Sequence, residues 1–349
     1  MSWDFEESYK KNIQKKKYIY GDKYFRIGNP FEWVDGDLQL SKQDFSGVID
    51  LLQWYSGYYE KYNTLKEFLY KDYKKDFNKI KYEFNKIFNF YLPFLKKDKC
   101  HQNNIECHSL ARAQDLCVIK KFCKNLNTKK IKREGIKHLD FGSGLGGAST
   151  YSLKVLKSDF ISIEAHKWSY NIQRMFYRKI INDNEKYLDL VSAESFGLSD
   201  KEINLLINSS DYKIKQIPSW YFDEIKKESQ DLITATTCLN EINNAGIIYF
   251  IVEANRTLKK DGYLYIRDSN KRKPGRNIVN YDEIFEKVLG YKVIKRFDLK
   301  NRKDIFAIPR LYQKKKSKNY EYTELFNKII GFEAVTSHGS IYDQNINAD

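Results

Sequence analysis

The sequence predicts an α/β protein with a doubly wound, Rossmann-like sheet of seven strands behind a mostly helical N-terminal region. A short β-prone run ends in a glycine cluster, Ile136 to Gly147, and a helix-capable segment follows it. Strand-length apolar runs then alternate with helical patterns as far as about residue 311. The first hundred residues instead carry aromatic stripes at helical spacing. Strands that alternate with helices imply a largely parallel sheet.

The bulk composition is that of a globular cytoplasmic protein. The 349 residues carry a net charge of +15 and five cysteines, an odd number that favours reduced thiols where no signal peptide is seen. The longest apolar run, about residues 247–252, is far shorter than the roughly 20 residues of a membrane span. Arginine supplies 12 of the 61 basic residues, and lysine is spread along the whole chain instead of forming a basic patch. The net charge is therefore weak evidence for nucleic-acid binding, and we do not expect nucleic acid as a partner.

The N-terminal region comprises residues 1–108. We expect residues 1–40 to be irregular, and residues from Ser41 to form helices, the longer one capped by Thr64 and ended by Pro93. Its aromatic stripes are expected to be core, and the region to enclose substrate or to form a homo-oligomer contact. The pairs Cys100-His101 and Cys107-His108 lack the spacing of a zinc clamp. They predict a loop, followed by a helix from Ser109 to about residue 126.

The glycine cluster fits two motifs. Gly142, Gly144 and Gly147 match G-x-G-x-x-G, the dinucleotide fingerprint. From Asp140 onward the same segment matches D-x-G-x-G-x-G, which resembles the first motif of class I S-adenosylmethionine (SAM) methyltransferases. A carboxylate two residues before the first glycine would repel a pyrophosphate but suits a cationic amino-acid or sulfonium group. Asp140 therefore favours SAM, with a dehydrogenase as the competing interpretation.

Three further strands are expected to complete the cofactor side. The second, residues 160–164, ends in Glu164, where an acid would bind a ribose diol. The third, residues 188–192, is followed by Ala193 and Glu194, a position at which methyltransferases contact adenine. Residues 209–230 are longer than a connection requires and are interpreted as a substrate-side insertion. The fourth strand, residues 231–237, ends in Thr237.

The remaining elements close the predicted sheet. A helix at residues 245–258 is followed by an Asp-Gly turn and a fifth strand that ends in Asp268. Residues 291–297 and 305–311 are the predicted sixth and seventh strands, the last of them antiparallel. The dehydrogenase interpretation expects no closing hairpin of this kind.

Residues 136–311 resemble class I SAM-dependent methyltransferases. Within that family, the chain is most similar to sugar O-methyltransferases of surface-polysaccharide and antibiotic gene clusters. The features that carry this similarity are residues 28–31 (Gly-Asn-Pro-Phe), 109–112 (Ser-Leu-Ala-Arg), 240–241 (Asn-Glu) and 338–339 (His-Gly). The resemblance implies a methyltransferase domain at 109–313 and a tail with a short helix at 314–349. It also implies SAM as the cofactor, bound by Asp140, Gly142, Ser143, Gly144, Gly146, Glu164, Ala193, Glu194 and Thr237.

A sugar hydroxyl is a poor nucleophile, so its methylation requires a base or a divalent metal. The candidates are Glu241 after the fourth strand, Asp268 after the fifth and His166 after the second. Glu241 and Asp268 are able to share Mg²⁺, although no metal ligand is assigned. The basic cluster 271–276 suits the diphosphate of a nucleotide-sugar. An RNA-directed methyltransferase is the alternative function, and a non-catalytic SAM-binding module is the third.

Overall fold

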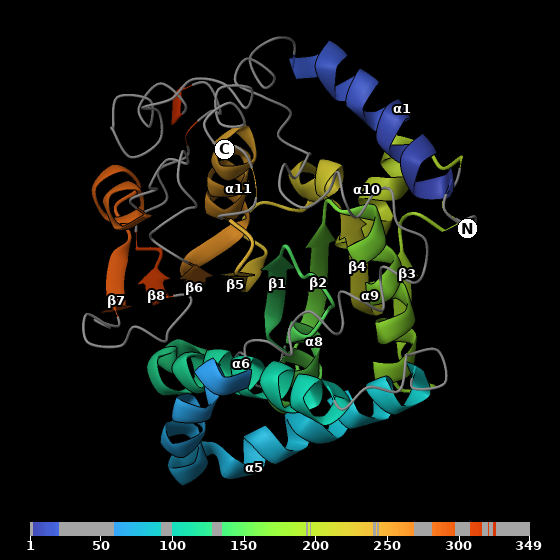
Figure 1. The fold of residues 1–349 in the computed structure, drawn as a ribbon. Helices are drawn as coiled ribbons and strands as arrows, with labels where there is room; N and C mark the ends of the chain where they lie inside the picture. The colour runs from blue at the N-terminus through green and yellow to red at the C-terminus, as the bar shows by residue number, and fades with distance from the viewer. Residues whose placement is uncertain are drawn as a thin grey trace, which may run out of the picture.

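The centre of the computed structural model is a mixed sheet of eight strands with helices on both faces (Figure 1). The strands lie in the order β3-β4-β2-β1-β5-β6-β8-β7. β8 is antiparallel to its neighbours β6 and β7, and all other neighbours are parallel. The strands are β1 (Lys137–Phe141), β2 (Asp159–Glu164), β3 (Lys186–Asp189), β4 (Tyr212–Pro218), β5 (Gln230–Thr236), β6 (Leu258–Asp268), β7 (Lys292–Arg296) and β8 (Ile308–Gln313).

The structure describes twelve ranges and single positions of the chain: 3–20, 59–91, 100–127, 135–192, 195, 197–239, 242, 244–268, 281–296, 308–315, 320 and 324–325. The segments 28–31, 271–276 and 338–339, which the sequence analysis singled out, lie outside these residues.

Strand β4 is the element that the sequence analysis missed, so the predicted count of seven strands is wrong. Its two isoleucines, Ile214 and Ile217, stand among polar residues without strict alternation, and it ends in a proline, so the segment looked like an insertion. The structure buries its polar side chains with partners. Lys215 donates to the carbonyl of Ile207 at 2.6 Å, and Gln216 donates to the carbonyl of Tyr170 at 2.6 Å. The closing antiparallel strand, by contrast, is confirmed in β8.

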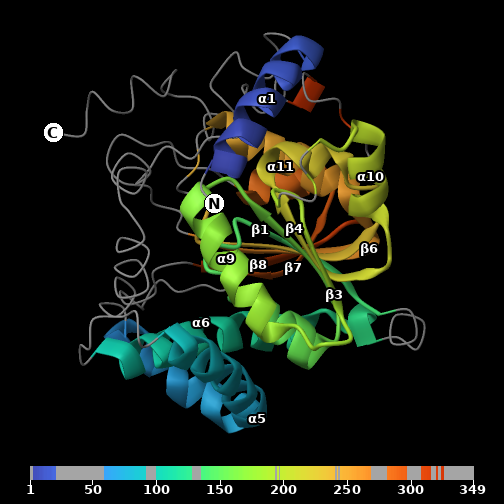
Figure 2. The ribbon, with the colours of Figure 1, turned by 90° about the vertical axis from the view of Figure 1, so that its right-hand side faces the viewer.

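Helices cover the two faces of the sheet in separate groups (Figure 2). One face carries α1, α10, η5 and α11, and the other carries α5, α6 and α8 with most of α9. The helical elements are α1 (Trp3–Tyr20), α5 (Tyr59–Tyr91), α6 (Cys100–Phe122), η3 (Lys124–Asn127), α8 (Ala148–Tyr151), η4 (Ser152–Leu156), α9 (Lys167–Ile180), α10 (Asp200–Asn208), η5 (Ser219–Glu224), α11 (Asn244–Thr257) and η6 (Glu283–Val288).

Helix α1 replaces the irregular structure expected for the first residues. It docks on η5 with a ring contact of 5.5 Å between Tyr9 and Trp220 and with an almost buried ion pair between Lys16 and Asp223. Ile13 joins the hydrophobic core on that face of the sheet. An N-terminal segment rich in charged residues thus becomes helical because a few of its side chains find partners in the sheet domain.

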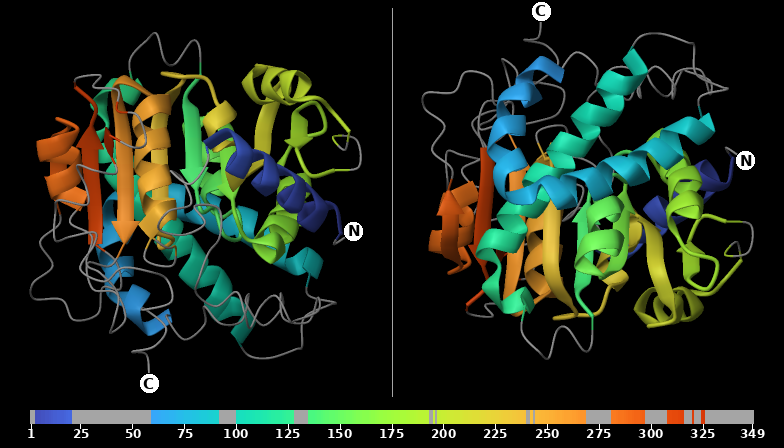
Figure 3. Two further views of the ribbon diagram at one scale, coloured as in Figure 1. Left: turned by 90° about the horizontal axis from the view of Figure 1, so that it is seen from above. Right: turned by 90° about the horizontal axis from the view of Figure 1, so that it is seen from below.

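Helices α5 and α6 pack against each other and cross the same face of the sheet (Figure 3). The predicted core stripe of α5 is confirmed by the buried side chains of Phe77, Ile80, Phe84, Ile87 and Phe88. The loop expected before Ser109 is wrong, because α6 begins at Cys100 and runs without a break across the expected domain boundary. These helices share one hydrophobic cluster with β2, β4, β5, β6 and β8.

His108, from the second Cys-His pair, lies inside this helical layer. Its ring stacks on that of Phe84 with 5.6 Å between centroids, and burial lowers the pKa of His108 to about 3. Cys107 is buried too, and burial raises the pKa of its thiol to about 12. These two side chains are therefore neutral core residues.

The C-terminal tail also contributes to the core, since the side chain of Leu325 is fully buried. In the described part of the chain, no helix combines the length and the apolar character that crossing a bilayer requires.

Candidate functional site

The glycine-rich loop joins β1 to α8 at the carboxyl edge of the sheet. Gly142, Gly144 and Gly146 have φ values of +67°, +53° and +78°, a left-handed conformation that favours glycine. The backbone N–H of Gly142 donates to the carbonyl of Ile163 at 2.9 Å, so the loop turns back over β2. The hydroxyl of Ser143 donates to the carbonyl of Asp140 at 2.9 Å and tightens the first turn.

Gly144 and Gly146 are glycine for different reasons. A Cβ atom at Gly146 would lie 2.8 Å from the ring of Tyr177, so this glycine is required for packing. A Cβ at Gly144 would meet no heavy atom of the described residues within 4 Å. The Cα side of Gly144 therefore faces open space, where a ligand is able to approach the loop closely, while its N–H and C=O groups bond to protein partners.

This loop lies at the topological switch point of the sheet. β1 has β2 on one side and β5 on the other, and the chain winds outward in opposite directions from these two neighbours. In open α/β sheets, ligands bind in the crevice outside the carboxyl ends of the strands at this point.

Asp140 is buried at the end of β1. Its Oδ1 accepts a hydrogen bond from the hydroxyl of Thr234 on β5 at 2.5 Å, whereas its Oδ2 is buried and has no hydrogen-bond partner among the described residues. Burial, opposed by the hydrogen bond from Thr234 and the charge of Arg112, raises the pKa of Asp140 to about 6. A buried carboxylate oxygen without a donor is costly, and a cationic ligand group would compensate it.

A series of buried, hydrogen-bonded polar groups orients the carboxylate of Asp140. Because Thr234 donates to Asp140, its oxygen accepts from His138 Nε2, 2.8 Å away, and His138 Nδ1 then accepts from the hydroxyl of Ser152 at 2.9 Å. Burial lowers the pKa of His138 to about 3, so its imidazole is neutral. The carboxylate is fixed in orientation by a network that carries no charge of its own.

Glu164 ends β2, as predicted, but its carboxylate faces the protein. Oε2 accepts from the backbone N–H of Gly144 at 2.9 Å and from Gln173 Nε2 at 3.0 Å. Oε1 accepts from the backbone N–H groups of Ala165 and His166, both at 2.9 Å. Gln173, which the sequence analysis did not single out, also donates to the carbonyl of Gly144 at 2.7 Å. Glu164 thus shapes the glycine loop directly.

The strand beside Glu164 is not the one expected. Pro218 of β4 is in register with Glu164, and β3 lies one strand further out. The position next to the end of β2 therefore belongs to the end of β4, where Ser219 is buried and its hydroxyl has no partner among the described residues. Ala193 and Glu194, assigned from the sequence after β3, lie outside the described residues.

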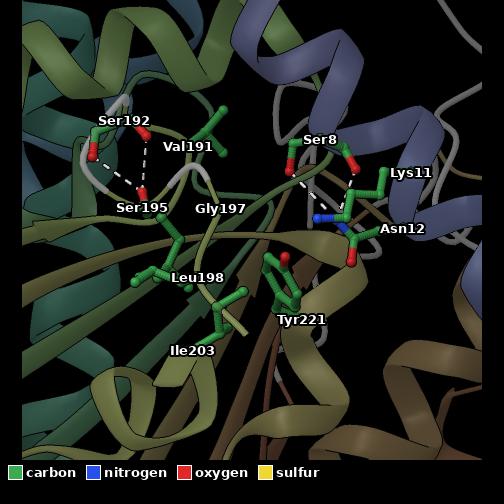
Figure 4. Close-up of a pocket in the computed structure, with 11 residues that line it drawn as sticks. Ser8, Lys11, Asn12, Val191, Ser192, Ser195, Gly197, Leu198, Ile203 and Tyr221 are labelled. Atoms are coloured by element: carbon green, nitrogen blue, oxygen red, sulfur yellow. Dashed lines mark hydrogen bonds between the residues drawn. The ribbon is translucent and has the colours of Figure 1, made fainter. Parts of the chain in front are cut away.

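A small pocket, partly open to solvent, lies beyond the end of β3 (Figure 4). Helix α1 forms one wall through Ser8, Lys11 and Asn12, and Tyr221 of η5 lines another. The hydroxyl of Ser195 donates to the carbonyl of Asp189 at 2.9 Å within the β3–α10 connection. The further lining residues are Leu190, Val191, Ser192, Gly197, Leu198 and Ile203.

The end of β5 carries backbone strain. Thr237 has a φ of +59°, rare for a β-branched residue, and its backbone N–H donates to the carbonyl of Arg267 at 2.8 Å. The preceding residue, Thr236, accepts a hydrogen bond from Arg112 Nη1 of α6 at 3.0 Å. Backbone strain of this kind is typical of ligand-binding sites. The conformation of Thr237 is therefore consistent with its prediction as a site residue, which stays a prediction.

The three catalytic candidates have different environments. Asp268 ends β6 and is fully buried, next to the strained end of β5. His166 is the N-cap of α9, where its ring accepts from the backbone N–H of Ser169, and burial lowers its pKa to about 4. Glu241 lies outside the described residues, as does Asn240. Within the residues that the structure describes, no group of three or more His, Cys, Asp or Glu side chains is placed to hold a metal ion.

Comparison with models of known protein families and with curated protein sequences gives no match. Among solved structures, the chain is similar to phosphoethanolamine N-methyltransferase 2 of Haemonchus contortus, solved with phosphomonomethylethanolamine and S-adenosylhomocysteine. That alignment covers 55% of this chain and 40% of the other, at 16% identity and a TM-score of 0.35.

Two further solved structures show the same level of similarity. The CurJ carbon methyltransferase has a TM-score of 0.41 and 11% identity over 60% of this chain and 56% of its own. A SAM-dependent methyltransferase from Aquifex aeolicus has a TM-score of 0.34 and 15% identity over 55% of this chain and 96% of its own. TM-scores below 0.5 carry no conclusion about activity. The closing antiparallel strand β8 is the feature of the sheet that the resemblance in sequence implied.

Proposed function

We propose that the chain is a SAM-dependent methyltransferase that methylates a hydroxyl of a sugar or nucleotide-sugar for surface polysaccharide or glycan decoration. One observation carries the cofactor assignment. The buried Oδ2 of Asp140 has no donor among the described residues, and it lies at the switch point beside Gly144, whose Cα side faces open space. A carboxylate in this position suits an ammonium or sulfonium group and disfavours a pyrophosphate.

The residues that would hold SAM are those of the loop and the neighbouring strand ends. We propose that Asp140 receives the cationic end, that Gly142, Ser143, Gly144 and Gly146 line the cofactor with their backbone, and that Glu164 turns toward the ribose when the cofactor binds. In the observed conformation four N–H groups already donate to Glu164, so contact with a ribose diol requires it to exchange at least one of them. Ala193 and Glu194 remain proposed contacts, joined by Ser219 at the end of β4, and Thr237 closes the opposite side.

When bound, SAM supplies an electrophilic methyl group. The protein has to orient the acceptor hydroxyl and take its proton. We assign this to Glu241, which follows β5 in the sequence, and to Asp268 at the end of β6, with His166 as the third candidate. Mg²⁺ held between the two carboxylates is the alternative way to lower the hydroxyl pKa. The sugar class rests on the resemblance in sequence, and the basic residues 271–276 are proposed to bind the phosphate groups of a nucleotide-sugar.

Calorimetry with S-adenosylhomocysteine tests the cofactor assignment. Gly144→Val places a branched side chain in the open space above the loop and should abolish binding. Gly290→Val is the matched control, because Gly290 also has a positive φ (+73°) and no atom of the described residues near its Cβ position, but lies between η6 and β7. Both variants carry the same backbone strain. Equal affinity in the two variants, or tight NAD binding by the wild type, would overturn the assignment.

A methyl-transfer assay with labelled SAM tests the acceptor. Sugars and nucleotide-sugars should take up label, and RNA should not. If RNA is labelled instead, and its binding weakens steeply with salt as phosphate contacts require, the RNA-directed alternative is correct.

A further inference from the structure

Arg112 of α6 reaches the switch point from outside the strand–helix core of the site. The side chain is 15% exposed, and its Nη1 donates to Thr236 Oγ1 at 3.0 Å. A Cβ atom at Gly147 would lie 3.5 Å from Arg112 Cδ, so the aliphatic part of the side chain passes close to the glycine loop. The sequence analysis noted Arg112 only as part of residues 109–112 and gave it no role.

The charge of Arg112 is only weakly matched by its protein neighbours. Asp115, the nearest acid, is bound at two points by Arg267, at 2.6 Å and 3.3 Å, and by the hydroxyl of Tyr265 at 2.8 Å. Arg112 approaches Asp115 only at 3.5 Å. A guanidinium has five N–H donors, and the described residues accept from Arg112 through Nη1 alone.

The positions of Arg112 and Asp140 complement a zwitterion. Asp140 is in register with Thr234, and Thr236, the partner of Arg112, lies two residues further along β5. Two residues of a strand span about 7 Å. Two charge-assisted hydrogen bonds of about 2.8 Å each and an amino-acid headgroup between them bridge a distance of this order. Asp140 Oδ2, which has no donor among the described residues, thus lies at the end of β1, and the guanidinium of Arg112, which has N–H donors to spare, contacts the end of the neighbouring strand β5.

We propose that Arg112 binds the carboxylate of the amino-acid moiety of SAM while Asp140 receives its ammonium group. This inference rests on the proposed function. It makes helix α6, outside the strands that carry the glycine motif, a specificity-determining part of the cofactor site. It also explains why a helix preceding the sheet is anchored at its carboxyl edge through Asp115, Arg267 and Thr236.

The test is a double-mutant-type thermodynamic cycle, measured by calorimetry, in which the Arg112 side chain and the carboxylate of the ligand are each removed. Wild type and Arg112→Met are each titrated with SAM and with decarboxylated SAM, which keeps the amine and the sulfonium. The wild type should bind SAM about 10- to 100-fold more tightly than the decarboxylated form, and Arg112→Met should bind the two about equally. Affinity for the decarboxylated form should be the same in both proteins, a result that a merely structural role would not produce.

Two control variants keep the outcome decisive. Arg178→Met, on the exposed face of α9, should retain the wild-type preference. Arg112→Lys should retain part of the preference for SAM over decarboxylated SAM, and this variant replaces Arg112→Met in the test if the methionine variant does not fold. Three outcomes would overturn the inference and leave the proposed function standing. They are a preference for SAM that survives in Arg112→Met, a wild type with no preference between the two ligands, and an equal loss of affinity for both ligands in Arg112→Met. A wild type that binds neither ligand would overturn both.

Discussion

The backbone N–H of Gly144 donates to the carboxylate of Glu164 across 2.9 Å, joining the glycine loop to the end of β2. Gln173 of α9 strengthens this junction, because its amide contacts both the carbonyl of Gly144 and the same carboxylate oxygen. The acid at the end of β2 therefore sets the shape of the loop, in addition to any contact that it makes with a ligand.

The first prediction follows from this junction. Glu164→Gln would turn an amide group toward N–H donors in a fully buried site and leave at least one of them without an acceptor. We expect a loss of about 1–3 kcal/mol in the free energy of unfolding, together with loss of SAM affinity. Urea unfolding followed by circular dichroism measures the first effect, and calorimetry measures the second.

Glu202→Gln is the matched control for that substitution. Glu202 forms a capping box with Ser199 at the exposed start of α10, a role that glutamine also fills. Its effect on unfolding should stay within about 0.5 kcal/mol. Equal effects of the two substitutions would show that the junction between Glu164 and Gly144 contributes little.

The sequence allowed the glycine loop, Asp140, Glu164 and the closing antiparallel strand to be predicted, because each has a local signature of turn residues or periodicity. β4 escaped prediction because the partners that satisfy its buried polar side chains belong to other elements: Ile207 lies eight residues before Lys215, and Tyr170 lies 46 residues before Gln216. The role of Arg112 escaped for the same reason, since it lies 124 residues before Thr236 in the chain. Helix α1 was missed because its stability depends on contacts with η5 that no local pattern records.

The second prediction concerns pH. Burial raises the folded-state pKa of Asp140 to about 6, above its ordinary value of 3.8. The folded state therefore binds more protons than the unfolded state between about pH 4 and pH 6, and Asp140 lowers stability as pH rises through that window. The full effect is on the order of 3 kcal/mol. A cationic ligand prefers the ionised carboxylate, so SAM affinity should rise up to about pH 6 and then level off.

Asp140→Asn isolates this contribution. The variant should be more stable than the wild type above pH 6, while its residual SAM affinity should no longer depend on pH in this range. Glu253, whose pKa burial raises to about 7, titrates in an overlapping range, so the informative quantity is the difference between the two proteins. Parallel pH profiles for wild type and variant would show that Asp140 is not the titrating group.

The third prediction tests whether the N-terminal helices belong to the core of the sheet domain. Phe84 of α5 is fully buried, and its Cζ would lie 3.1 Å from a Cβ at Gly147 in the glycine loop. Phe84→Ala should cost about 3–5 kcal/mol in urea unfolding and weaken SAM binding. Tyr82→Ala, on the exposed face of the same helix, should cost at most about 1 kcal/mol. A small cost at Phe84 would mean that α5 is a detachable layer.

The last prediction concerns the transfer step. Asp268 ends β6 at the carboxyl edge of the sheet, where the acceptor hydroxyl should meet the methyl group, and its side chain is fully buried. Glu241, which follows β5 in the sequence, is the other carboxylate proposed for this step. Glu241→Gln keeps the size of the side chain but removes the charge that takes a proton or holds a metal. Turnover should fall about 10²–10⁴-fold, or roughly 3–5 kcal/mol of barrier, while SAM affinity stays unchanged.

Asp268→Asn should behave in the same way if the two carboxylates share Mg²⁺, and EDTA should then silence the wild type and be reversed by added Mg²⁺. His166→Asn is the comparison, because asparagine retains the N-cap of α9 while removing the imidazole. It should keep near-normal turnover if the base is a carboxylate, since a histidine with a pKa of about 4 is a weak base at neutral pH. Normal turnover in both carboxylate variants, with a large loss in His166→Asn at unchanged stability, would move the proton-accepting role to His166.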